Sequence, residues 1–259
     1  MAYRMFLFDI DGTLTDRSTD KIPDTNVTTL KRLREQGYLV VICTGRMHKA
    51  APMLKEAGVE YDYIIGASGH VIADGNDQVI WSVRIREEPY RKINEYCQNN
   101  GIGLFWKYED GCYAYGPHPV IERILNSNPA CYYRQREEED LLPNCGALAG
   151  DEEKIRAFQK EFAQYVDVVH GGFILEDLCL KGISKHTGIE KLLEITQVKR
   201  EETMSFGDSE NDIEMLTYTG VGIAMGDAME KARQAADWVS VSSRDGGILK
   251  ALQHFGILI

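Results

Sequence analysis

Two carboxylates, Asp9 and Asp11, stand two residues apart at the end of a short apolar segment near the start of the chain. The segment runs from Tyr3 to Ile10 and is followed by Asp11-Gly12, which indicates a buried strand and then a turn. A carboxylate can attack phosphorus to form an acyl phosphate, and a second one nearby can protonate a leaving alcohol and later activate water. An acidic turn that merely ends a strand would have the same local sequence, so this pair needs support from elsewhere in the chain.

Two short sequences that contain glycine offer backbone groups to an anion. Gly12 allows a tight turn and a close approach of its N–H group. Thr44, Gly45 and Arg46 follow a second apolar segment, Leu39–Cys43, and a hydroxyl with backbone N–H groups at a strand-to-helix turn suits phosphate oxygens. Arg46 could equally be a surface ion-pair partner.

Two further aspartates, Asp208 and Asp212, lie in the sequence Gly-Asp-Ser-Glu-Asn-Asp, residues 207–212, which ends a later apolar segment. Ser209 and Asp212 fit a helix-capping pattern, so a structural role for Asp212 is as well supported as a metal-binding one. Asp208 precedes the cap and has no such structural role. With Asp9 it would offer the sparse carboxylate set that Mg²⁺ prefers, with waters and substrate oxygens completing the octahedron.

One lysine stands where the helix dipole disfavours a positive charge. Lys185 begins a predicted helix, and this misfit favours a functional role for it. A solvated side chain is the alternative, and Lys181 is a nearby competitor for the same role.

Strands and helices alternate at both ends of the chain. We expect Asp24 to cap a helix that stops near Gly37, and a helix over Ser209–Tyr218. Strands are expected at 3–10, 39–43, 63–66, 203–206, 222–225 and 238–241. This rhythm predicts an α/β fold, a Rossmann-like parallel sheet with helices on both faces, whose active site lies where the strands end.

The rhythm changes in the middle of the chain, where strand pairs with interspersed helices indicate an α+β unit. We therefore predict a discontinuous core over 1–83 and 184–259, interrupted by an inserted α+β cap domain over 84–183. Within the insertion, the charge run at 134–140 is expected to be a solvated loop, and His170-Gly171-Gly172 a hairpin turn.

The composition of the chain indicates which binding partners and which cellular location to expect. The 259 residues carry a formal net charge of −11, which disfavours binding to nucleic acid phosphates. No apolar run reaches the ~18 residues that span a bilayer, and no signal peptide is visible. The six cysteines lack metal-binding spacing and a disulfide framework is not expected in a chain of this length. We expect a cytoplasmic, soluble protein with no nucleic-acid or membrane partner.

Taken together, the motifs resemble those of a known family. DIDGTL at 9–14, TGR at 44–46, Lys185 in GISKHTGI and GDSEND at 207–212 stand in the order found in the haloacid dehalogenase (HAD) superfamily of phosphatases. Because the insertion falls between the second and third motifs, the chain resembles the Cof-like subclass IIB in particular. The resemblance covers essentially the whole chain, with one departure at Ser68-Gly69, where many relatives have Asn-Gly.

The resemblance implies a role for each matching residue. Asp9 would be the nucleophile and a Mg²⁺ ligand, and Asp11 the general acid/base, whose backbone carbonyl also binds the metal. Asp208 would be the third protein ligand. The expected site is catalytic Asp9, Asp11, Thr44 and Lys185; phosphate-binding Gly12, Gly45, Arg46 and Asn211; and metal-binding Asp9, Asp11, Asp208 and Asp212.

We therefore expect a Mg²⁺-dependent phosphatase that hydrolyses a small phosphorylated metabolite, a sugar phosphate or a phosphorylated cofactor, through an aspartyl-phosphate. A phosphomutase that uses the same phospho-aspartate is an alternative. A non-catalytic sensor of a phosphorylated ligand is another, although binding alone needs neither a nucleophile nor an acid/base. The protein is expected to be a monomer or a small homo-oligomer. The motifs leave open the identity of the metabolite and the cap residues that select it.

Overall fold

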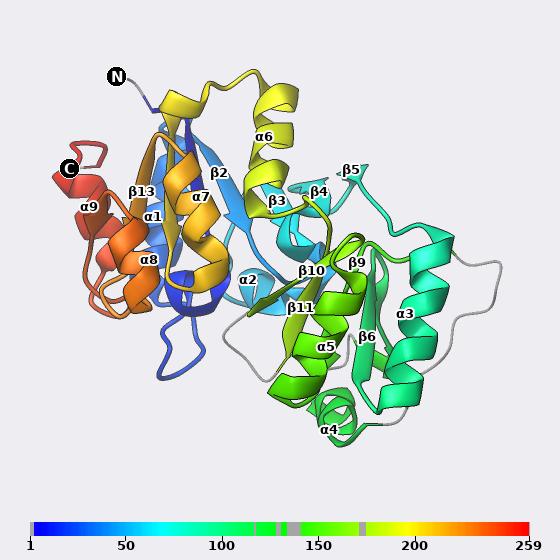
Figure 1. The fold of residues 1–259 in the computed structure, drawn as a ribbon. Coiled ribbons are helices and arrows are strands. Elements are labelled where there is room, and N and C mark those ends of the chain that lie inside the picture. The colour runs from blue at the N-terminus through cyan, green and yellow to red at the C-terminus, as the bar shows by residue number, and fades with distance from the viewer. Residues whose placement is uncertain (1–2, 117, 128–130, 134–140, 171–174, 259) are drawn as a thin grey trace. The chain divides into compact units, whose positions relative to one another are not determined.

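The computed structural model describes residues 3–116, 118–127, 131–133, 141–170 and 175–258, and the chain forms two compact units (Figure 1). The first, called the core unit here, consists of Met1–Ile80 and Ser184–Ile259. The second, the inserted unit, consists of Trp81–Ile183. No helix in the described part of the chain is long and apolar enough to cross a membrane.

Among the described residues, an eight-stranded sheet runs through the core unit in the order β14-β13-β12-β1-β2-β3-β4-β5. The strands from β14 to β3 are parallel to their neighbours, and β4 runs antiparallel to β3. Their bounds are β1 Met5–Phe8, β2 Leu39–Cys43, β3 Tyr63–Gly66, β4 Val71–Asp74, β5 Val79–Ser82, β12 Thr203–Gly207, β13 Val221–Ala224 and β14 Trp238–Val239.

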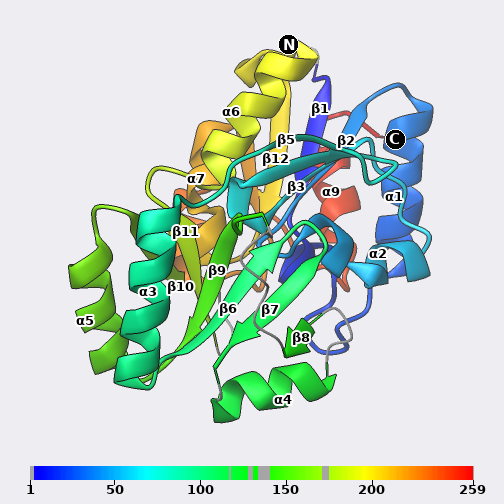
Figure 2. The ribbon, with the colours of Figure 1, turned by 90° about the vertical axis from the view of Figure 1, so that its right-hand side faces the viewer.

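Helices cover both faces of this sheet (Figure 2), with α6 and α7 on one face and α1 and α9 on the other. The helix bounds are α1 Asp24–Glu35, α2 Pro52–Glu56, α6 Lys185–Thr196, α7 Ile213–Tyr218, α8 Glu230–Ala235 and α9 Gly247–His254. The predicted α/β fold with a parallel sheet is thereby confirmed.

The two central strands, β1 and β12, form the most buried part of the core. All four residues of β1 are fully buried, because helices pack on both of its faces. Phe8 and Phe206 stack with ring centroids 4.9 Å apart, which fixes β1 beside β12. The ends of these strands are therefore held rigidly.

Several expected boundaries were wrong; the strand expected at 238–241, for example, ends at Val239. β1 ends at Phe8, because the chain then turns over Ile10–Leu14, where the Leu14 N–H donates back to the Asp9 carbonyl. Asp24 is the first residue of α1 and does not cap it; Pro23 precedes the helix without a side-chain capping bond. The helix expected over Ser209–Tyr218 is a short turn followed by α7, which begins only at Ile213.

In the described part of the inserted unit, six strands form a second sheet in the order β10-β11-β9-β6-β7-β8. Their bounds are β6 Gly103–Tyr108, β7 Gly111–Tyr115, β8 Cys131–Tyr133, β9 Cys145–Ala149, β10 Val166–His170 and β11 Glu176–Leu180, and the helices are α3 Glu87–Asn100, α4 Pro119–Ser127 and α5 Glu152–Phe162. Only the β7–β8 pair is parallel among the pairings described.

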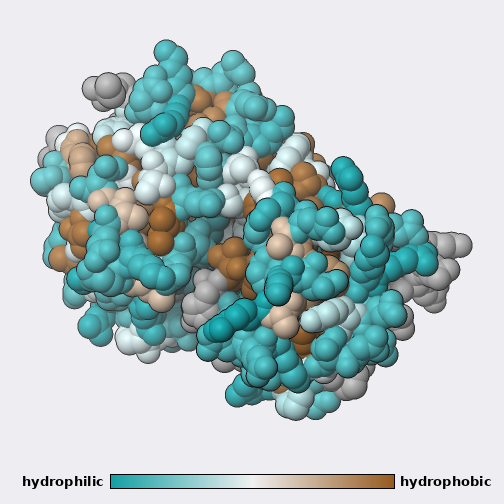
Figure 3. All heavy atoms as spheres, viewed as in Figure 1, coloured by the Kyte–Doolittle hydropathy of each residue, from teal (hydrophilic) through white to brown (hydrophobic). Residues whose placement is uncertain are grey.

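Side-chain alternation along β6 divides the inserted unit into two packing layers. Leu104 and Trp106 pack with α3 and α5, whereas Phe105 points to the other face and packs with Ile121 of α4. The expected loop at 134–140 and the Gly171-Gly172 part of the expected turn lie outside the described residues. On the face drawn in Figure 3, hydrophilic side chains cover most of both units.

Candidate active site

The site begins with three side chains that follow neighbouring parallel strands. Asp9 follows β1, Thr44 follows β2, and Asp208 follows β12. Because β12, β1 and β2 are adjacent and parallel, their carboxyl ends meet at one edge of the sheet. This is the edge where open α/β sheets bind their ligands.

The turn after β1 brings a threonine onto the end of β12. Gly12 has a φ of +93°, and a Cβ atom there would overlap the Asp208 carboxylate, so the turn requires glycine. Thr13 Oγ1 donates to Asp208 Oδ1 at 3.0 Å. The Gly12 N–H donates to Thr15 Oγ1 at 3.0 Å, so its expected role toward phosphate stays a prediction.

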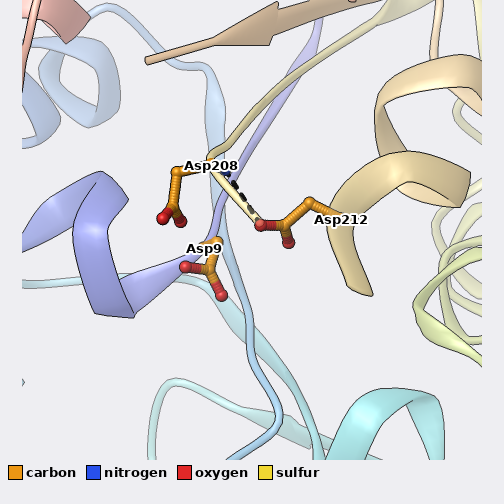
Figure 4. A group of neighbouring side chains, drawn as sticks. All are labelled: Asp9, Asp208 and Asp212. Carbon is orange, nitrogen blue, oxygen red and sulfur yellow. Dashed lines mark hydrogen bonds between the residues drawn. The ribbon is translucent and has the colours of Figure 1, made fainter. Parts of the chain in front are cut away.

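Asp9, Asp208 and Asp212 form a buried carboxylate cluster (Figure 4). One oxygen from each lies within 4.8 Å of the others, and the residues are at most 5% exposed. The Asp208 N–H also donates to Asp212 Oδ2 at 3.0 Å, drawn as a dashed line in Figure 4. Three carboxylates this close repel one another strongly unless cations lie among them.

Lys185 supplies one of these cations. Its Nζ donates to Asp9 Oδ1 at 2.7 Å and to Asp212 Oδ1 at 2.6 Å, and the side chain is 1% exposed. Lys181 instead pairs with Asp167 at 2.6 Å within the inserted unit. The structure therefore places Lys185, and not its competitor, in the carboxylate cluster.

The start of α6 is held so that Lys185 points inward. The Ser184 N–H donates to Thr187 Oγ1 at 3.0 Å, which caps the helix. Gly69, with a φ of +99°, packs so closely on the Ser184 carbonyl that no Cβ atom would fit. Ser68 beside it is buried and has a left-handed φ of 53°, a conformation that asparagine adopts more readily than most residues.

Asp212 performs the capping role that its sequence position suggested, and it also pairs with Lys185. Its Oδ2 accepts from the N–H of Ser209 at 3.0 Å and from the Ser209 hydroxyl at 3.1 Å, which is the capping role. Its Oδ1 is paired with Lys185. Both oxygens are thus engaged, so Asp212 is better arranged to hold Lys185 than to bind a metal directly.

The pKa directions agree with excess negative charge in the cluster. Burial and the neighbouring Asp212 raise the pKa of Asp9 well above its ordinary value, and Lys185 opposes this. Burial and Asp212 likewise raise the pKa of Asp208 to about 6, against the effect of Arg17. Burial lowers the pKa of Lys185, but Asp212 and Asp9 outweigh it and the net direction is upward. A hard divalent cation beside Asp9 and Asp208 would relieve this repulsion, so the residues present fit a metal.

Arg46 is paired with Asp11 in this structure. Its Nε donates to Asp11 Oδ2 at 2.8 Å and its terminal nitrogen to Asp11 Oδ1 at 2.7 Å. The expected contact of Arg46 with phosphate stays a prediction, as do those of Gly45, which joins Thr44 to Arg46, and of Asn211, whose Oδ1 accepts from the Ser209 hydroxyl at 2.6 Å.

Arg17 is a candidate site residue that the sequence did not indicate. This arginine lies on the loop after the Ile10–Leu14 turn, and its guanidinium forms an ion pair with the Asp208 carboxylate. The only feature of the sequence that could have indicated a role for it is its position as a basic residue, eight residues after Asp9 in an acidic chain. Nothing in the sequence indicates which carboxylate such a side chain meets.

Comparisons with known proteins agree with the fold and the motifs. A family model described as haloacid dehalogenase-like hydrolase matches residues 6–252. The chain is 30% identical to YkrA of Bacillus subtilis (strain 168), a protein provisionally named a phosphatase, over the full length of both.

Two solved structures are close to this one. BT1666 from Bacteroides thetaiotaomicron, studied as a HAD phosphatase, has a TM-score of 0.89 at 29% identity and covers 99% of this chain and 96% of its own. BT4131, described as a HAD subclass IIB sugar phosphatase, has a TM-score of 0.86 at 28% identity. The match covers 98% of this chain and 100% of BT4131. This chain therefore belongs to the haloacid dehalogenase-like hydrolases and is a phosphatase of that superfamily.

Proposed function

We propose that the chain is a Mg²⁺-dependent phosphatase that hydrolyses a small phosphorylated metabolite through an aspartyl-phosphate on Asp9. One observation carries the proposal: Asp9, buried at the end of β1, lies against both Asp208 and the ammonium of Lys185. A nucleophilic carboxylate, a candidate metal ligand and a fixed cation thus surround one point at the edge of the sheet.

The proposed reaction has two steps. A carboxylate oxygen of Asp9 attacks phosphorus, the ester P–O bond breaks, and the leaving oxygen takes a proton from the carboxyl group of Asp11. Asp11 then accepts a proton from water, whose oxygen attacks the same phosphorus, and inorganic phosphate leaves as Asp9 is restored. The ester is thereby hydrolysed with the net consumption of one water molecule.

The remaining residues position and neutralise the reacting groups. Lys185 fixes the attacking carboxylate and offsets charge on the phosphoryl oxygens, with Thr44 at the end of β2 as a further donor. Asp9 and Asp208 are the side chains that would hold Mg²⁺, which supplies additional charge neutralisation when bound. The backbone carbonyl of Asp11 is a proposed third protein ligand.

The substrate is proposed to be a sugar phosphate or a phosphorylated cofactor. The similarity to BT4131, whose description names a sugar phosphatase, supports the first class. We also propose that the inserted segment, residues 84–183, acts as a cap domain that selects the substrate. Replacing this segment with a short linker should then leave Mg²⁺ binding intact and abolish discrimination among substrates.

The test is release of inorganic phosphate from a panel of phosphorylated metabolites, with Mg²⁺ and with excess EDTA. We expect release that requires the metal and disappears in Asp9→Asn. Glu194→Gln, which alters an exposed ion pair of the core unit, serves as the control and should keep activity.

Other outcomes would point to the alternatives. Transfer of the phosphoryl group to a second substrate molecule without phosphate release would indicate a phosphomutase. Binding of a phosphorylated ligand with neither release nor transfer would indicate a sensor. Turnover that persists in EDTA after exhaustive dialysis would refute the metal requirement.

A further inference from the structure

Arg17 reaches the candidate metal site from the solvent side. Its side chain is 43% exposed, whereas Asp208, its partner, is 1% exposed. The guanidinium lies over Gly12, where a Cβ atom would meet both Arg17 and Asp208. Among the described residues, the hydrogen bonds and ion pairs of this guanidinium involve Asp208 alone.

This ion pair and metal binding compete for the same carboxylate. Thr13 already donates to Oδ1 of Asp208, and Arg17 holds Oδ2. If Asp208 held a divalent cation, the guanidinium would face two positive charges at a few ångströms, and its attraction to this site would become repulsion. Arg17 would then release the carboxylate, and its donors would be available to another acceptor.

The freed guanidinium is closer to solvent than the residues proposed to receive the phosphoryl group. Asp9, Thr44 and Lys185 are 5%, 1% and 1% exposed, so the reacting phosphorus lies at the buried end of the site. Arg17 is carried by the surface loop in which Asp16 and Lys21 pair. A substrate group that meets Arg17 would therefore lie on the leaving-group side.

We propose that Arg17 is a specificity-determining residue that binds an anionic group on the leaving-group side of the substrate after a metal has taken Asp208. The preferred substrates are then phosphate esters that carry a second anion, a carboxylate or another phosphate. Arginine matches either group with two parallel hydrogen bonds. This inference rests on the proposed function, because it requires the phosphoryl group to be bound at Asp9.

The test compares two non-hydrolysable ligands, 3-phosphonopropionate and propylphosphonate, which differ in a carboxylate in place of a methyl group. Their affinities are measured by calorimetry in saturating Mg²⁺. A charge-assisted pair should make the wild-type protein bind 3-phosphonopropionate about 10- to 100-fold more tightly. The ratio should fall to about one in Arg17→Gln and to an intermediate value in Arg17→Lys.

Arg233→Gln is the matched control, because Arg233 is 42% exposed and paired with the single carboxylate of Glu230. It should keep the wild-type ratio. In a separate titration without phosphonate, Arg17→Gln should bind Mg²⁺ about tenfold more tightly than the wild type, since no guanidinium has to be displaced.

Equal affinity of the wild-type protein for the two phosphonates would overturn the inference. An equal loss of affinity for both phosphonates in Arg17→Gln would overturn it as well. The latter would mean that Arg17 binds the reacting phosphoryl group. An unchanged Mg²⁺ affinity would contradict the exchange at Asp208. If the wild-type protein with Mg²⁺ binds neither phosphonate, the proposed phosphate site itself fails; binding of propylphosphonate without discrimination counts against Arg17 alone.

Discussion

The guanidinium of Arg46 holds both carboxylate oxygens of Asp11, with donor–acceptor distances of 2.8 and 2.7 Å. The pair links the turn after β1 to the turn after β2, and it raises the pKa of Arg46, chiefly through the hydrogen bond to Asp11. A carboxylate held at both oxygens has a defined direction. In this structure Arg46 therefore determines where the ionised Asp11 side chain, the proposed acid/base group, points.

Removing this pair should impair proton transfer more than phosphate binding. We expect Arg46→Ala to lower turnover of an alkyl phosphate by about 100-fold, because a catalytic group displaced by ~1 Å can cost that much. Turnover of an aryl phosphate should fall much less in Arg46→Ala, since its leaving group departs without a proton. Steady-state rates with both esters measure the difference.

Arg34→Ala is the matched control for this experiment. Arg34 and Arg46 are both 32% exposed, and their partners Asp62 and Asp11 are 24% and 26% exposed. Arg34 pairs with Asp62 and Glu60, which lie just before β3 at the opposite end of the strands from Asp11. Turnover of both esters should therefore stay at the wild-type rate in Arg34→Ala. An equal loss on the two esters in Arg46→Ala would assign Arg46 to phosphate binding instead.

Asp9 and Asp11 should differ sharply when each is changed to asparagine. Asp9→Asn removes the nucleophile, so no phospho-enzyme should form. Asp11→Asn keeps the backbone carbonyl and should bind Mg²⁺ almost normally, while turnover of an alkyl ester falls roughly 100- to 10,000-fold. Rapid-quench detection of the phospho-enzyme and Mg²⁺ titration separate the two variants. Wild-type turnover in Asp11→Asn would remove Asp11 from the mechanism.

Lys185→Met should destabilise the metal-free protein. It leaves Asp9 and Asp212 buried without their shared cation, and breaking a buried ion pair typically costs about 3–5 kcal/mol. The pKa of Asp9 is already raised by burial and by Asp212, and losing Lys185 raises it further. The folded variant then binds protons that the unfolded chain has released, so its stability falls as pH rises and recovers toward acidic pH.

Urea unfolding of both proteins in EDTA at pH 5.5 and pH 8 measures this effect. The free energy of unfolding of Lys185→Met should fall below that of the wild type at both pH values, and the difference should be clearly larger at pH 8. A deficit that is equal at the two pH values would show that the variant suffers from lost packing and not from unpaired carboxylates.

Metal binding should stabilise the folded protein. At 100 times the dissociation constant, a ligand that binds only the native state adds about 2.7 kcal/mol. In a chain of this size that corresponds to roughly 5–10 °C in Tm, which differential scanning calorimetry detects easily. Asp208→Asn should abolish the shift and Asp167→Asn should keep it. A shift that survives in Asp208→Asn would place the metal elsewhere.

The sequence predicted those parts of the site that follow from strand order. Asp9, Thr44 and Asp208 could be grouped because each follows an apolar strand, and the carboxyl ends of parallel strands share an edge. The unusual place of Lys185 at a helix start made it a candidate with Lys181 as a competitor, and the resemblance to the HAD motifs assigned it a role. The grouping of the strand ends needed only periodicity and the positions of turns.

The pairing of long side chains could not be predicted in the same way. The direction of Arg46 toward Asp11 and of Arg17 toward Asp208 depends on loop geometry that no periodic pattern encodes. The strand β8 has only three residues, which is too short for an alternation to be recognised. The cytoplasmic location and the oligomeric state stay predictions.

The pairing of β1 with β12 has a consequence during protein synthesis. Phe8 and its neighbour Phe206 belong to strands separated by most of the chain, with the whole inserted unit between them. At roughly 5–20 residues per second, a ribosome takes about 10–40 s to reach β12 after completing β1. During that time a fully apolar strand has one unpaired edge, which is a template for aggregation. Nascent chains that stall within the inserted unit should therefore be the ones that depend most on chaperones.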